Sequence, residues 1–329
     1  MGSLELVCPA GSPAMLRAAI SAGADAVYCG LRDETNARNF PGLNFSPDEL
    51  RESVVWAHGR AARVFVAINT FARAGAAAAW LRAVDIAVEA GVDAVIAADL
   101  GVLGYAAAAH PDLRLHLSVQ AAANSAEALQ VYGETYGVKR AVLPRVLSAE
   151  EIAGLTGGPV EIETFVFGGL CVMAEGRCAL SSYVTGRSPN LSGVCSPAEA
   201  VSFGREGSVL TPRLGGVALD RLEAGEVAGY PTLCKGRFEA GGEAGYLFEE
   251  PTSLNAMALL TAFKAAGVSA VKIEGRQRGK AYVARVAAVF RSAIDALDRG
   301  EDIARFEGRL SDLAEGGRET AGAYRRGWR

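Results

Sequence analysis

The chain has 329 residues, half of them apolar, and a formal net charge of −4 at pH 7. This length and composition exclude a disordered chain and fit one large domain or two small ones. The acidic balance gives no electrostatic footprint for DNA, although a local basic patch can still serve RNA.

The amino-terminal residues show no basic segment followed by an apolar run, and no stretch reaches the roughly 18 uninterrupted apolar residues of a membrane span. We therefore expect no signal peptide, no transmembrane segment and a cytoplasmic protein. In a reducing compartment, six cysteines indicate a metal or catalytic site more than a disulfide framework.

A helix end, a glycine and a short apolar run recur along the chain, at residues 22–28, 90–96 and 266–272 and more loosely at 136–143. Glycine readily adopts the left-handed backbone conformation with which many helices end, and the apolar run is typical of a buried parallel strand. In chain order, the predicted strands are 4–8, 26–30, 64–69, 94–98, 114–119, 141–144, 160–167 and 270–274. The predicted helices are 13–22, 46–59, 76–90, 125–136, 148–155 and 279–297.

Strands that alternate with helices predict an α/β fold, and eight of them predict a TIM-like (β/α)8 barrel. A doubly wound open sheet is the alternative, because spacing alone does not prove closure. The alternation breaks after strand seven, in a Gly- and Pro-rich stretch that holds four of the six cysteines. We expect residues 1–167 to form seven βα units, 168–252 a cysteine-bearing insertion, 253–298 the last βα unit and 299–329 a charged, partly ordered tail.

The four clustered cysteines are Cys171, Cys178, Cys195 and Cys234. Four thiolates in one insertion can hold zinc or an iron–sulfur cluster. Zinc sites usually show cysteine pairs two to four residues apart. The wider spacing here favours the bulkier iron–sulfur cluster, while zinc and unliganded thiols stay open. Because Cys171 follows strand seven, the site is expected at the carboxyl-terminal face of the barrel, where such folds carry their active sites.

The run from Glu163 to Ser181 resembles the signature of the collagenase-like peptidase family U32. The likeness rests on Glu163-Thr-Phe165, Gly168, Cys171, Gly176-Arg-Cys178 and Ser181, with Gly169 where the pattern usually has Ser or Ala. The segments 8–11 and 272–276 also resemble family hallmarks. The segments 28–38, 99–103, 143–148 and 229–237 resemble the UbiU branch, which supplies a subunit of the oxygen-independent hydroxylase of ubiquinone biosynthesis.

This resemblance implies a 4Fe–4S cluster on the four cysteines and prephenate as the oxygen donor in place of O₂. It also implies a polyprenyl aromatic quinone precursor as the substrate and a heterodimer with a UbiV-like paralogue, without which the subunit would be inactive. An accessory lipid-carrier protein is a further expected partner, because no strongly amphipathic helix is evident in the sequence to deliver the substrate.

Polar residues near the predicted strand ends are candidates for the active site. An anionic donor needs cationic groups, and arginine binds carboxylates through two hydrogen bonds. The alternatives are a satisfied polar layer inside the barrel, solvated surface arginines and an ion pair between Lys272 and Glu274. The expected catalytic residues are Arg145, His116, Gln120, Lys272 and Glu274, and the expected substrate-binding residues are Arg32, Asn36, Arg38, Asn69, Ser118, Asn124 and Arg276.

Three other functions compete with the quinone hydroxylase. They are an RNA-base hydroxylase of the same family, a non-catalytic iron–sulfur scaffold subunit and a peptidase. The peptidase is the least favoured, because the sequence has neither a His-Glu-x-x-His motif nor a Gly-x-Ser-x-Gly motif and contains only three histidines.

Overall fold

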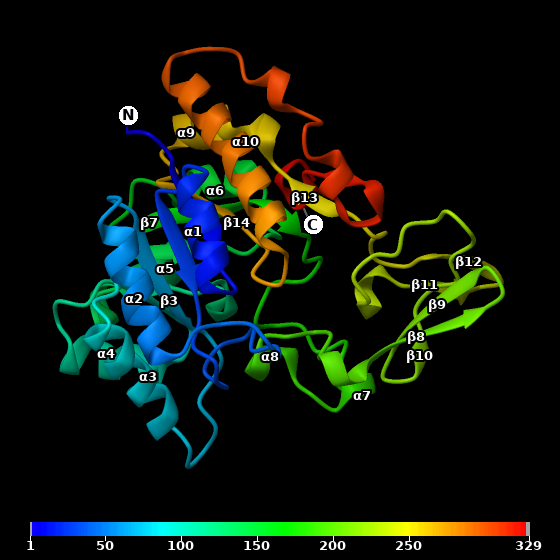
Figure 1. The fold of residues 1–329 in the computed structure, drawn as a ribbon, viewed down its shortest axis with the longest axis horizontal. Helices are drawn as coiled ribbons and strands as arrows, with labels where there is room; N and C mark the ends of the chain where they lie inside the picture. The colour runs from blue at the N-terminus through cyan, green and yellow to red at the C-terminus, as the bar shows by residue number, and fades with distance from the viewer. Residues whose placement is uncertain (1, 327–329) are drawn as a thin grey trace.

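The computed structural model describes residues 2–326 and contains a closed barrel of eight parallel strands (Figure 1). Neighbouring strands pair in chain order from β1 to β7, and β14 pairs with both β7 and β1. This double pairing excludes the open sheet and confirms the TIM-like barrel. The barrel strands are β1 (Glu5–Pro9), β2 (Ala26–Cys29), β3 (Arg63–Ile68), β4 (Ala94–Ala97), β5 (Leu115–Leu117), β6 (Arg140–Val142), β7 (Glu161–Gly169) and β14 (Ala270–Ile273).

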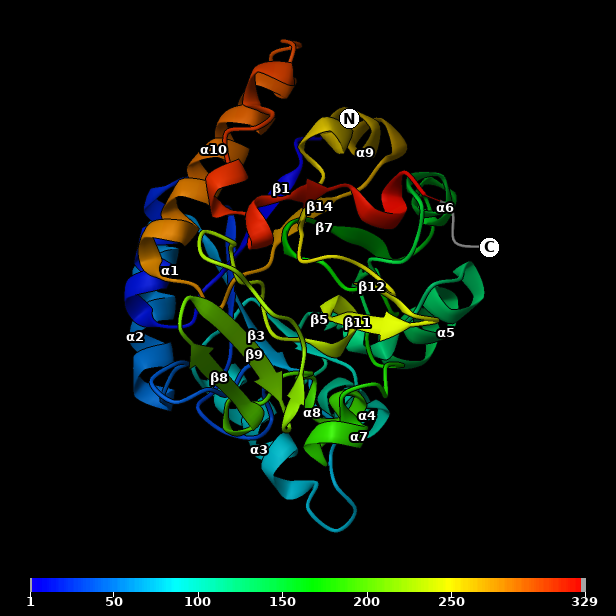
Figure 2. The same ribbon diagram turned by 90° about the vertical axis from the view of Figure 1, so that its right-hand side faces the viewer.

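Helices connect the strands and cover the outside of the barrel (Figures 1 and 2). Two of them are absent from the predicted ranges. For the helix before Gly267 the recurring glycine marked only the end. The helix after Asp99 was not predicted at all, because its run of apolar residues shows no helical period. This helix is capped by Asp99, whose carboxylate accepts hydrogen bonds from the N–H groups of Gly101 and Val102. The helices are α1 (Pro13–Ser21), α2 (Pro47–His58), α3 (Ala78–Glu89), the unpredicted α4 (Leu100–Ala109), α5 (Ala126–Tyr136), α6 (Ala149–Leu155), α9 (Leu260–Ala266) and α10 (Lys280–Asp298).

The recurring glycines behave as the sequence predicts. Gly23, Gly91 and Gly267 follow helix ends with φ angles of 98°, 76° and 91°. In the first two copies the aspartate that follows reaches back to the preceding strand. The carboxylate of Asp25 accepts from the N–H of Leu6 at 2.7 Å, and that of Asp93 accepts from the N–H of Val64 at 2.7 Å. All three repeats therefore end a helix, and the first two also anchor a strand.

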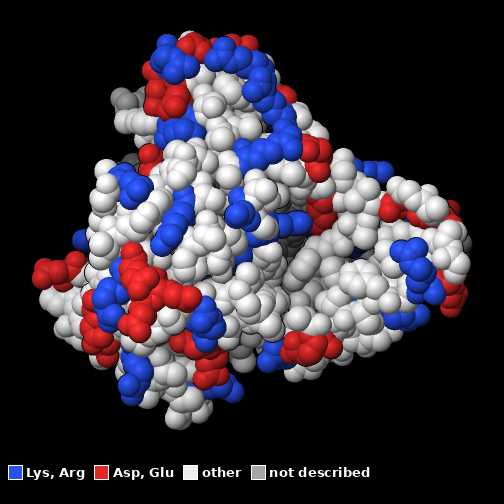
Figure 3. All heavy atoms as spheres, viewed as in Figure 1, with Lys and Arg blue, Asp and Glu red and all other residues white. Residues whose placement is uncertain are grey.

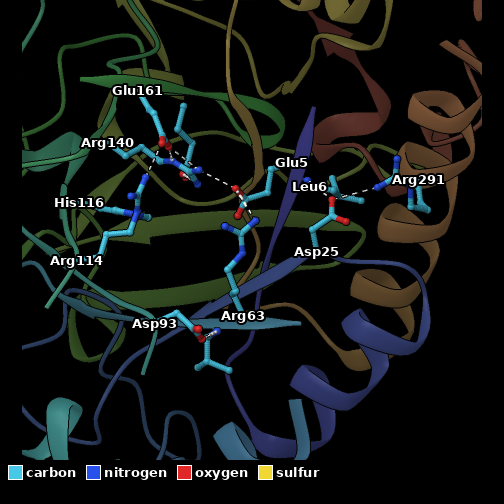
Figure 4. Close-up of polar contacts among 12 residues, drawn as sticks. Glu5, Leu6, Asp25, Arg63, Asp93, Arg114, His116, Arg140, Glu161 and Arg291 are labelled. Atoms are coloured by element: carbon cyan, nitrogen blue, oxygen red, sulfur yellow. Dashed lines mark hydrogen bonds and ion pairs between the residues drawn. The ribbon is translucent and has the colours of Figure 1, made fainter. Parts of the chain in front are cut away.

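A network of buried charges closes the amino-terminal end of the barrel (Figure 4). The Arg140 guanidinium, with its side chain 4% exposed, bonds Glu5 at 2.7 Å and Glu161 at 2.8 Å. It also lies 3.4 Å from the buried Glu163 carboxylate. Arg63 joins the network through Glu5. This ionic layer fills the end of the barrel opposite to the expected site.

The insertion between β7 and α9 forms a lobe beside the barrel, at the right of Figure 1. Its middle part is a three-stranded antiparallel sheet followed by a two-stranded hairpin, and the chain returns through β13, which pairs antiparallel with the end of β7. The elements are α7 (Ser182–Thr185), α8 (Pro189–Ser192), β8 (Val201–Glu206), β9 (Val209–Leu214), β10 (Val217–Ala218), β11 (Arg237–Ala240), β12 (Glu243–Tyr246) and β13 (Ser253–Asn255).

Residues 299–326, hereafter the C-terminal segment, pack against the barrel instead of forming the partly ordered tail that we expected. Strand β15 (Glu319–Thr320) pairs with β13 and extends the sheet. Tyr324 is buried, and its hydroxyl donates to the carbonyl of Phe165 at 2.7 Å. The buried apolar side chains Phe306 and Leu310 explain why this charged segment folds back.

None of the helices in the described part of the chain is both long and apolar enough to cross a membrane.

Candidate functional site

A cavity of about 130 Å³ lies at the carboxyl ends of the barrel strands, under the insertion. We call it the mouth cavity. Figure 3 shows the surface hollowed between the barrel and the lobe, with Lys or Arg side chains along the barrel side of the hollow. Of the predicted residues, the cavity is lined by Arg38, Asn69, Ser118, Gln120, Arg145, Lys272, Glu274, Arg276 and all four clustered cysteines.

The four cysteines come from distant parts of the insertion, yet they share this one cavity. All are free thiols and all are partly buried. Burial raises the pKa of Cys171, Cys195 and Cys234, and the neighbouring thiols raise it further. The same three cysteines line a second cavity of about 110 Å³. Within residues 2–326, no three His, Cys, Asp or Glu side chains are arranged around the position of a single metal ion.

Arg145 fastens the first two cysteines to the barrel. Glu175 lies between Cys171 and Cys178 in the sequence, and its carboxylate accepts a hydrogen bond from the Arg145 Nε at 2.6 Å. The Arg145 Nη1 donates to the Gly169 carbonyl at 2.5 Å. The guanidinium lies 4.2 Å from the centre of the Phe165 ring. Burial opposes the charge of Arg145, but the neighbouring negative groups, of which Glu175 contributes most, together outweigh burial and raise the pKa of Arg145. Two of the five N–H donors of the Arg145 guanidinium are thus engaged within the protein, one of them in an ion pair.

Arg276 is a buried cation with a different set of contacts. Its NH1 donates to the Asn36 amide oxygen at 2.6 Å, and its guanidinium carbon lies 5.5 Å from the Tyr28 ring centre. It forms no ion pair with any carboxylate in the described residues, and burial lowers its pKa to about 10. A buried guanidinium without a carboxylate partner is unfavourable, and a bound anion would offset its cost.

Arg38 faces the same cavity from the loop after β2. Its NH1 donates to the Gly193 carbonyl of the insertion at 2.5 Å, and it likewise forms no ion pair in the described residues. The Glu274 carboxylate, which accepts from the Gly169 N–H at 3.0 Å, is a nearby negative charge. Burial raises the pKa of Glu274, but the cations Arg38 and Arg145 outweigh it and lower the pKa.

Lys272 does not pair with Glu274, which was one alternative. Its Nζ lies 2.6 Å from the Glu163 carboxylate and 3.9 Å from the Tyr28 ring centre. Burial lowers the pKa of Lys272. This lysine therefore links the floor of the mouth cavity to the ionic layer below it.

Neutral polar groups complete the cavity wall. The Asn69 amide oxygen accepts from the Ala37 N–H at 3.0 Å, which leaves its amide nitrogen for a ligand. The Ser118 hydroxyl oxygen accepts from the Gln120 N–H. The side-chain oxygens of Gln120 and Asn190 are buried and have no hydrogen-bond partner among residues 2–326.

Four predicted residues lie outside the mouth cavity. Arg32 is exposed and pairs with Glu49 at 2.8 Å, and Asn124 is exposed after the turn that follows β5. Asn36 is buried outside the lining of the mouth cavity, and its amide oxygen accepts a hydrogen bond from the cavity residue Arg276.

His116 is the fourth. It is the middle residue of β5, its Nε2 accepts a hydrogen bond from Arg114 (Figure 4), and its ring makes a T-shaped contact with Phe65. The strand ends at Leu117, so His116 lies below the mouth while Ser118 and Gln120 reach it.

Sequence reasoning missed several wall residues. Phe165 and Tyr28 lie on predicted strands, and the alternation of inward and outward side chains was the signal that could have identified them. Glu175 lies in the sequence between two of the predicted cysteines. Asn190, on the short helix α8, had no signal in the sequence.

The fold and the site define a TIM-like barrel whose mouth is lined by cysteines and arginines. The model of peptidase family U32 matches residues 11–325. The chain belongs to peptidase family U32, as the resemblance of its motifs predicted.

Named relatives carry different descriptions. The tRNA hydroxylation protein P of Escherichia coli K12 is 33% identical over 95% of this chain and 72% of its own length. An uncharacterized protease of Methanocaldococcus jannaschii is 31% identical over 90% of this chain and 66% of its own length. Among solved structures, a U32 peptidase aligns with a TM-score of 0.50 and 16% identity, over 85% of this chain and 96% of its own, which supports the fold alone. The UbiU branch is not singled out by these relatives.

Proposed function

We propose that this protein is an oxygen-independent hydroxylase that acts on a base of RNA in the mouth cavity. The observation that carries the proposal is that one cavity is lined by four free cysteines and by two arginines, Arg38 and Arg276, that form no ion pair within the described part of the chain. The name of the Escherichia coli relative, a tRNA hydroxylation protein, supports RNA as the substrate.

The cysteines fit a 4Fe–4S cluster held by Cys171, Cys178, Cys195 and Cys234. A cubane takes its thiolates at separate corners, so its ligands need to share a cavity without meeting at one point. When bound, such a cluster supplies electron transfer or an iron atom that polarises a ligand. The protein contributes the partly buried thiols and the cations beside them.

Arg38 and Arg276 would hold the oxygen donor. Prephenate carries two carboxylates, and guanidinium groups bind carboxylates through charge-assisted hydrogen bonds. The Asn69 amide nitrogen and the Ser118 hydroxyl add neutral donors to the wall of the same cavity. The flat apolar side chains Tyr28 and Phe165 provide the surface on which an aromatic or pyrimidine ring can lie.

A deletion strain tests the proposal directly. Hydrolysed RNA from the strain should lack a hydroxylated pyrimidine that wild-type RNA contains, as measured by liquid chromatography and mass spectrometry. Complementation with the intact gene should restore the nucleoside, and complementation with Cys171→Ala should not. RNA whose hydroxylated nucleosides are unchanged by the deletion would refute an RNA substrate.

The second candidate is the ubiquinone hydroxylase subunit, acting with a UbiV-like partner on a polyprenyl aromatic precursor that an accessory lipid-carrier protein delivers. It is favoured by the UbiU-like segments 28–38 and 229–237 and by the apolar wall of the cavity. The same deletion strain, grown without oxygen, decides between the two: lost ubiquinone with unchanged nucleosides supports the quinone substrate.

A peptidase finds little support in the site. All three histidines are among the described residues, and none lines the mouth cavity. His58 and His110 bond Asp93 and Asp85 on the outside of the barrel, and His116 is buried below the mouth. The variant Arg276→Met distinguishes the catalytic proposal from the scaffold alternative. If the cavity is catalytic, this variant should make no product and should still bind iron.

A further inference from the structure

The C-terminal segment makes a buried contact with the part of the insertion that carries the last cysteines. Glu315 lies in this segment, and its side chain is 3% exposed. Its Oε2 accepts from the Lys235 Nζ at 2.6 Å, and its Oε1 accepts from the Tyr230 N–H at 2.6 Å. Its own N–H donates to the Ser253 hydroxyl oxygen at 2.8 Å.

These contacts flank Cys234. Lys235 is the next residue, its side chain is 4% exposed, and its Nζ also donates to the Thr252 carbonyl at 3.0 Å. Cys234 lies in the short turn Leu233–Lys235. The position of this turn therefore depends on an ion pair with a residue 80 positions further along the chain.

The same loop reaches Cys195. The Tyr230 hydroxyl donates to the Ser196 carbonyl at 3.2 Å, and the Ser196 hydroxyl donates to the Pro231 carbonyl at 2.5 Å. The Glu315 carboxylate binds the backbone N–H of Tyr230, and the Tyr230 hydroxyl binds Ser196. A chain of hydrogen bonds therefore runs from the C-terminal segment through Tyr230 to the residue after Cys195.

The fit around Glu315 is close. A Cβ atom on Gly229 would come within 3.0 Å of the Glu315 Oε1 and 2.6 Å of the Pro251 Cβ. Gly316 has a φ of 61°, and a Cβ there would lie 2.3 Å from the Pro251 carbonyl oxygen. Two glycines thus allow the C-terminal segment and the insertion to approach each other at this point.

The first two cysteines are held differently. Arg145 binds Glu175 between them, and Gly176 packs so closely on the Gln120 carbonyl that a Cβ would lie 1.9 Å from it. Cys171 and Cys178 thus depend on the barrel, and Cys234 depends on the C-terminal segment. Cys195 is held from both sides, because Arg38 of the barrel also donates to the Gly193 carbonyl two residues before it.

We infer that Glu315 is a positioning residue for the cysteine site, holding Cys234 and Cys195 opposite to Cys171 and Cys178. The inference deepens the proposed function, because it rests on these cysteines forming one ligand set. It concerns the geometry of the thiols, so it can be measured in the metal-free protein as well as in the loaded one.

The six cysteines provide the measurement. The metal-free full chain is treated with iodoacetamide, and the modification rate at each cysteine is followed by peptide mass spectrometry. In Glu315→Gln, we expect Cys195 and Cys234 to react about tenfold faster than in the wild type, as local opening would cause. Cys171 and Cys178 should keep their rates. Cys8 and Cys29, fully buried in β1 and β2, report whether the barrel remains folded.

Glu250→Gln is the matched control, because Glu250 pairs with Arg318 of the same segment at the exposed surface. It should leave all six rates unchanged. The conservative variant Glu315→Asp should restore part of the protection. After anaerobic reconstitution, Glu315→Gln should bind about half as much iron per chain as the wild type or less, since a positioning residue supports metal affinity.

Equal rates at Cys195 and Cys234 in wild type and Glu315→Gln would overturn the inference. Faster reaction of Cys8 and Cys29 as well would also overturn it, because Glu315 would then support the whole fold. If the wild type binds no iron at all, the cluster proposal fails, but the modification rates still decide whether Glu315 holds the two cysteines.

Discussion

At the scale of single residues, Arg276 is a buried cation that has no carboxylate partner among the residues that the structure describes. Its one side-chain hydrogen bond goes to the Asn36 amide oxygen, which also accepts from the Arg38 N–H. The residue therefore costs stability in the free protein and gains a counter-charge when an anion binds.

Arg276→Met should accordingly abolish the product in complemented cells while leaving the iron content unchanged. Because it removes an unpaired buried charge, the free energy of unfolding in urea should stay the same or rise by about 1 kcal/mol. Arg32→Met, on an exposed arginine outside the cavity, is the control and should leave the product unchanged. A stable Arg276→Met that still makes wild-type amounts of product would exclude Arg276 from ligand binding.

His116 predicts a pH dependence of stability. Burial, together with the charges of Arg140 and Arg114, lowers its pKa well below the usual range. Below the pKa of about 6.5 in the unfolded chain, that chain binds a proton that the folded protein does not, so folding loses up to about 1.4 kcal/mol per pH unit as pH falls.

Urea unfolding at about pH 7 and about pH 5.5 measures this term, since the unfolded histidine titrates between them. In His116→Gln the free energy of unfolding should fall less between these two pH values than it does in the wild type. In His58→Gln it should fall as much as in the wild type, because His116 remains. The same decrease in His116→Gln and the wild type would show that His116 contributes no such term.

At the scale of structural elements, the ionic layer at the amino-terminal end of the barrel joins strands that are far apart in sequence. Arg140 on β6 bonds Glu5 on β1, 135 positions away. Removing one member of a buried charge network leaves its partners without compensation.

Arg140→Met should therefore lower the free energy of unfolding by about 3–5 kcal/mol. The exposed pair of Arg285 and Asp312 gives the comparison: Arg285→Met should cost about 1 kcal/mol or less, as surface ion pairs do. Both values come from urea unfolding at neutral pH, and similar small losses in the two variants would contradict a structural role for the ionic layer.

The contact between the cysteine loop and the barrel depends on Gly176. Gly176→Ala adds both a left-handed strain of about 1 kcal/mol and a collision with the Gln120 carbonyl. Iron content after reconstitution should fall well below that of the wild type. Gly186→Ala shares the positive φ, at 69°, but has open space around its Cβ, so it should keep its iron. Equal iron in the two variants would mean that this contact does not shape the site.

At the scale of the whole molecule, the C-terminal segment is part of the barrel's own packing. Tyr324 bonds the Phe165 carbonyl on β7, and its ring centre lies 5.4 Å from that of Phe263 on α9. Tyr324→Ala should cost about 3–5 kcal/mol, as large-to-small changes in cores do. Tyr183→Ala, on a side chain that is 88% exposed, should stay within about 0.5 kcal/mol. A Tyr324→Ala protein as stable as Tyr183→Ala would mean that the segment is only loosely attached.

The strands and the barrel order were predictable because the buried runs are short and mostly apolar, and because a helix-ending glycine precedes four of the eight, β2, β4, β6 and β14. Strand five shows where this reasoning fails: its polar alternation suggested residues 114–119, but the strand ends at Leu117 and Ser118 begins a turn. Within the insertion no period exists to follow, so Asn190 could not be found. The pairing of Lys235 with Glu315 spans 80 positions, and only the folded chain brings them together.

The closing pair of β7 and β14 has a consequence for the newly made chain. The register joins Glu163 to Ala270, so more than a hundred residues must leave the ribosome between the two partners. During that interval, β1 and β7 are both sheet edges with unpaired backbone groups, which favour association with other chains. A chaperone that shields these edges during synthesis would therefore raise the yield of folded protein, and slow translation of the insertion would lower it.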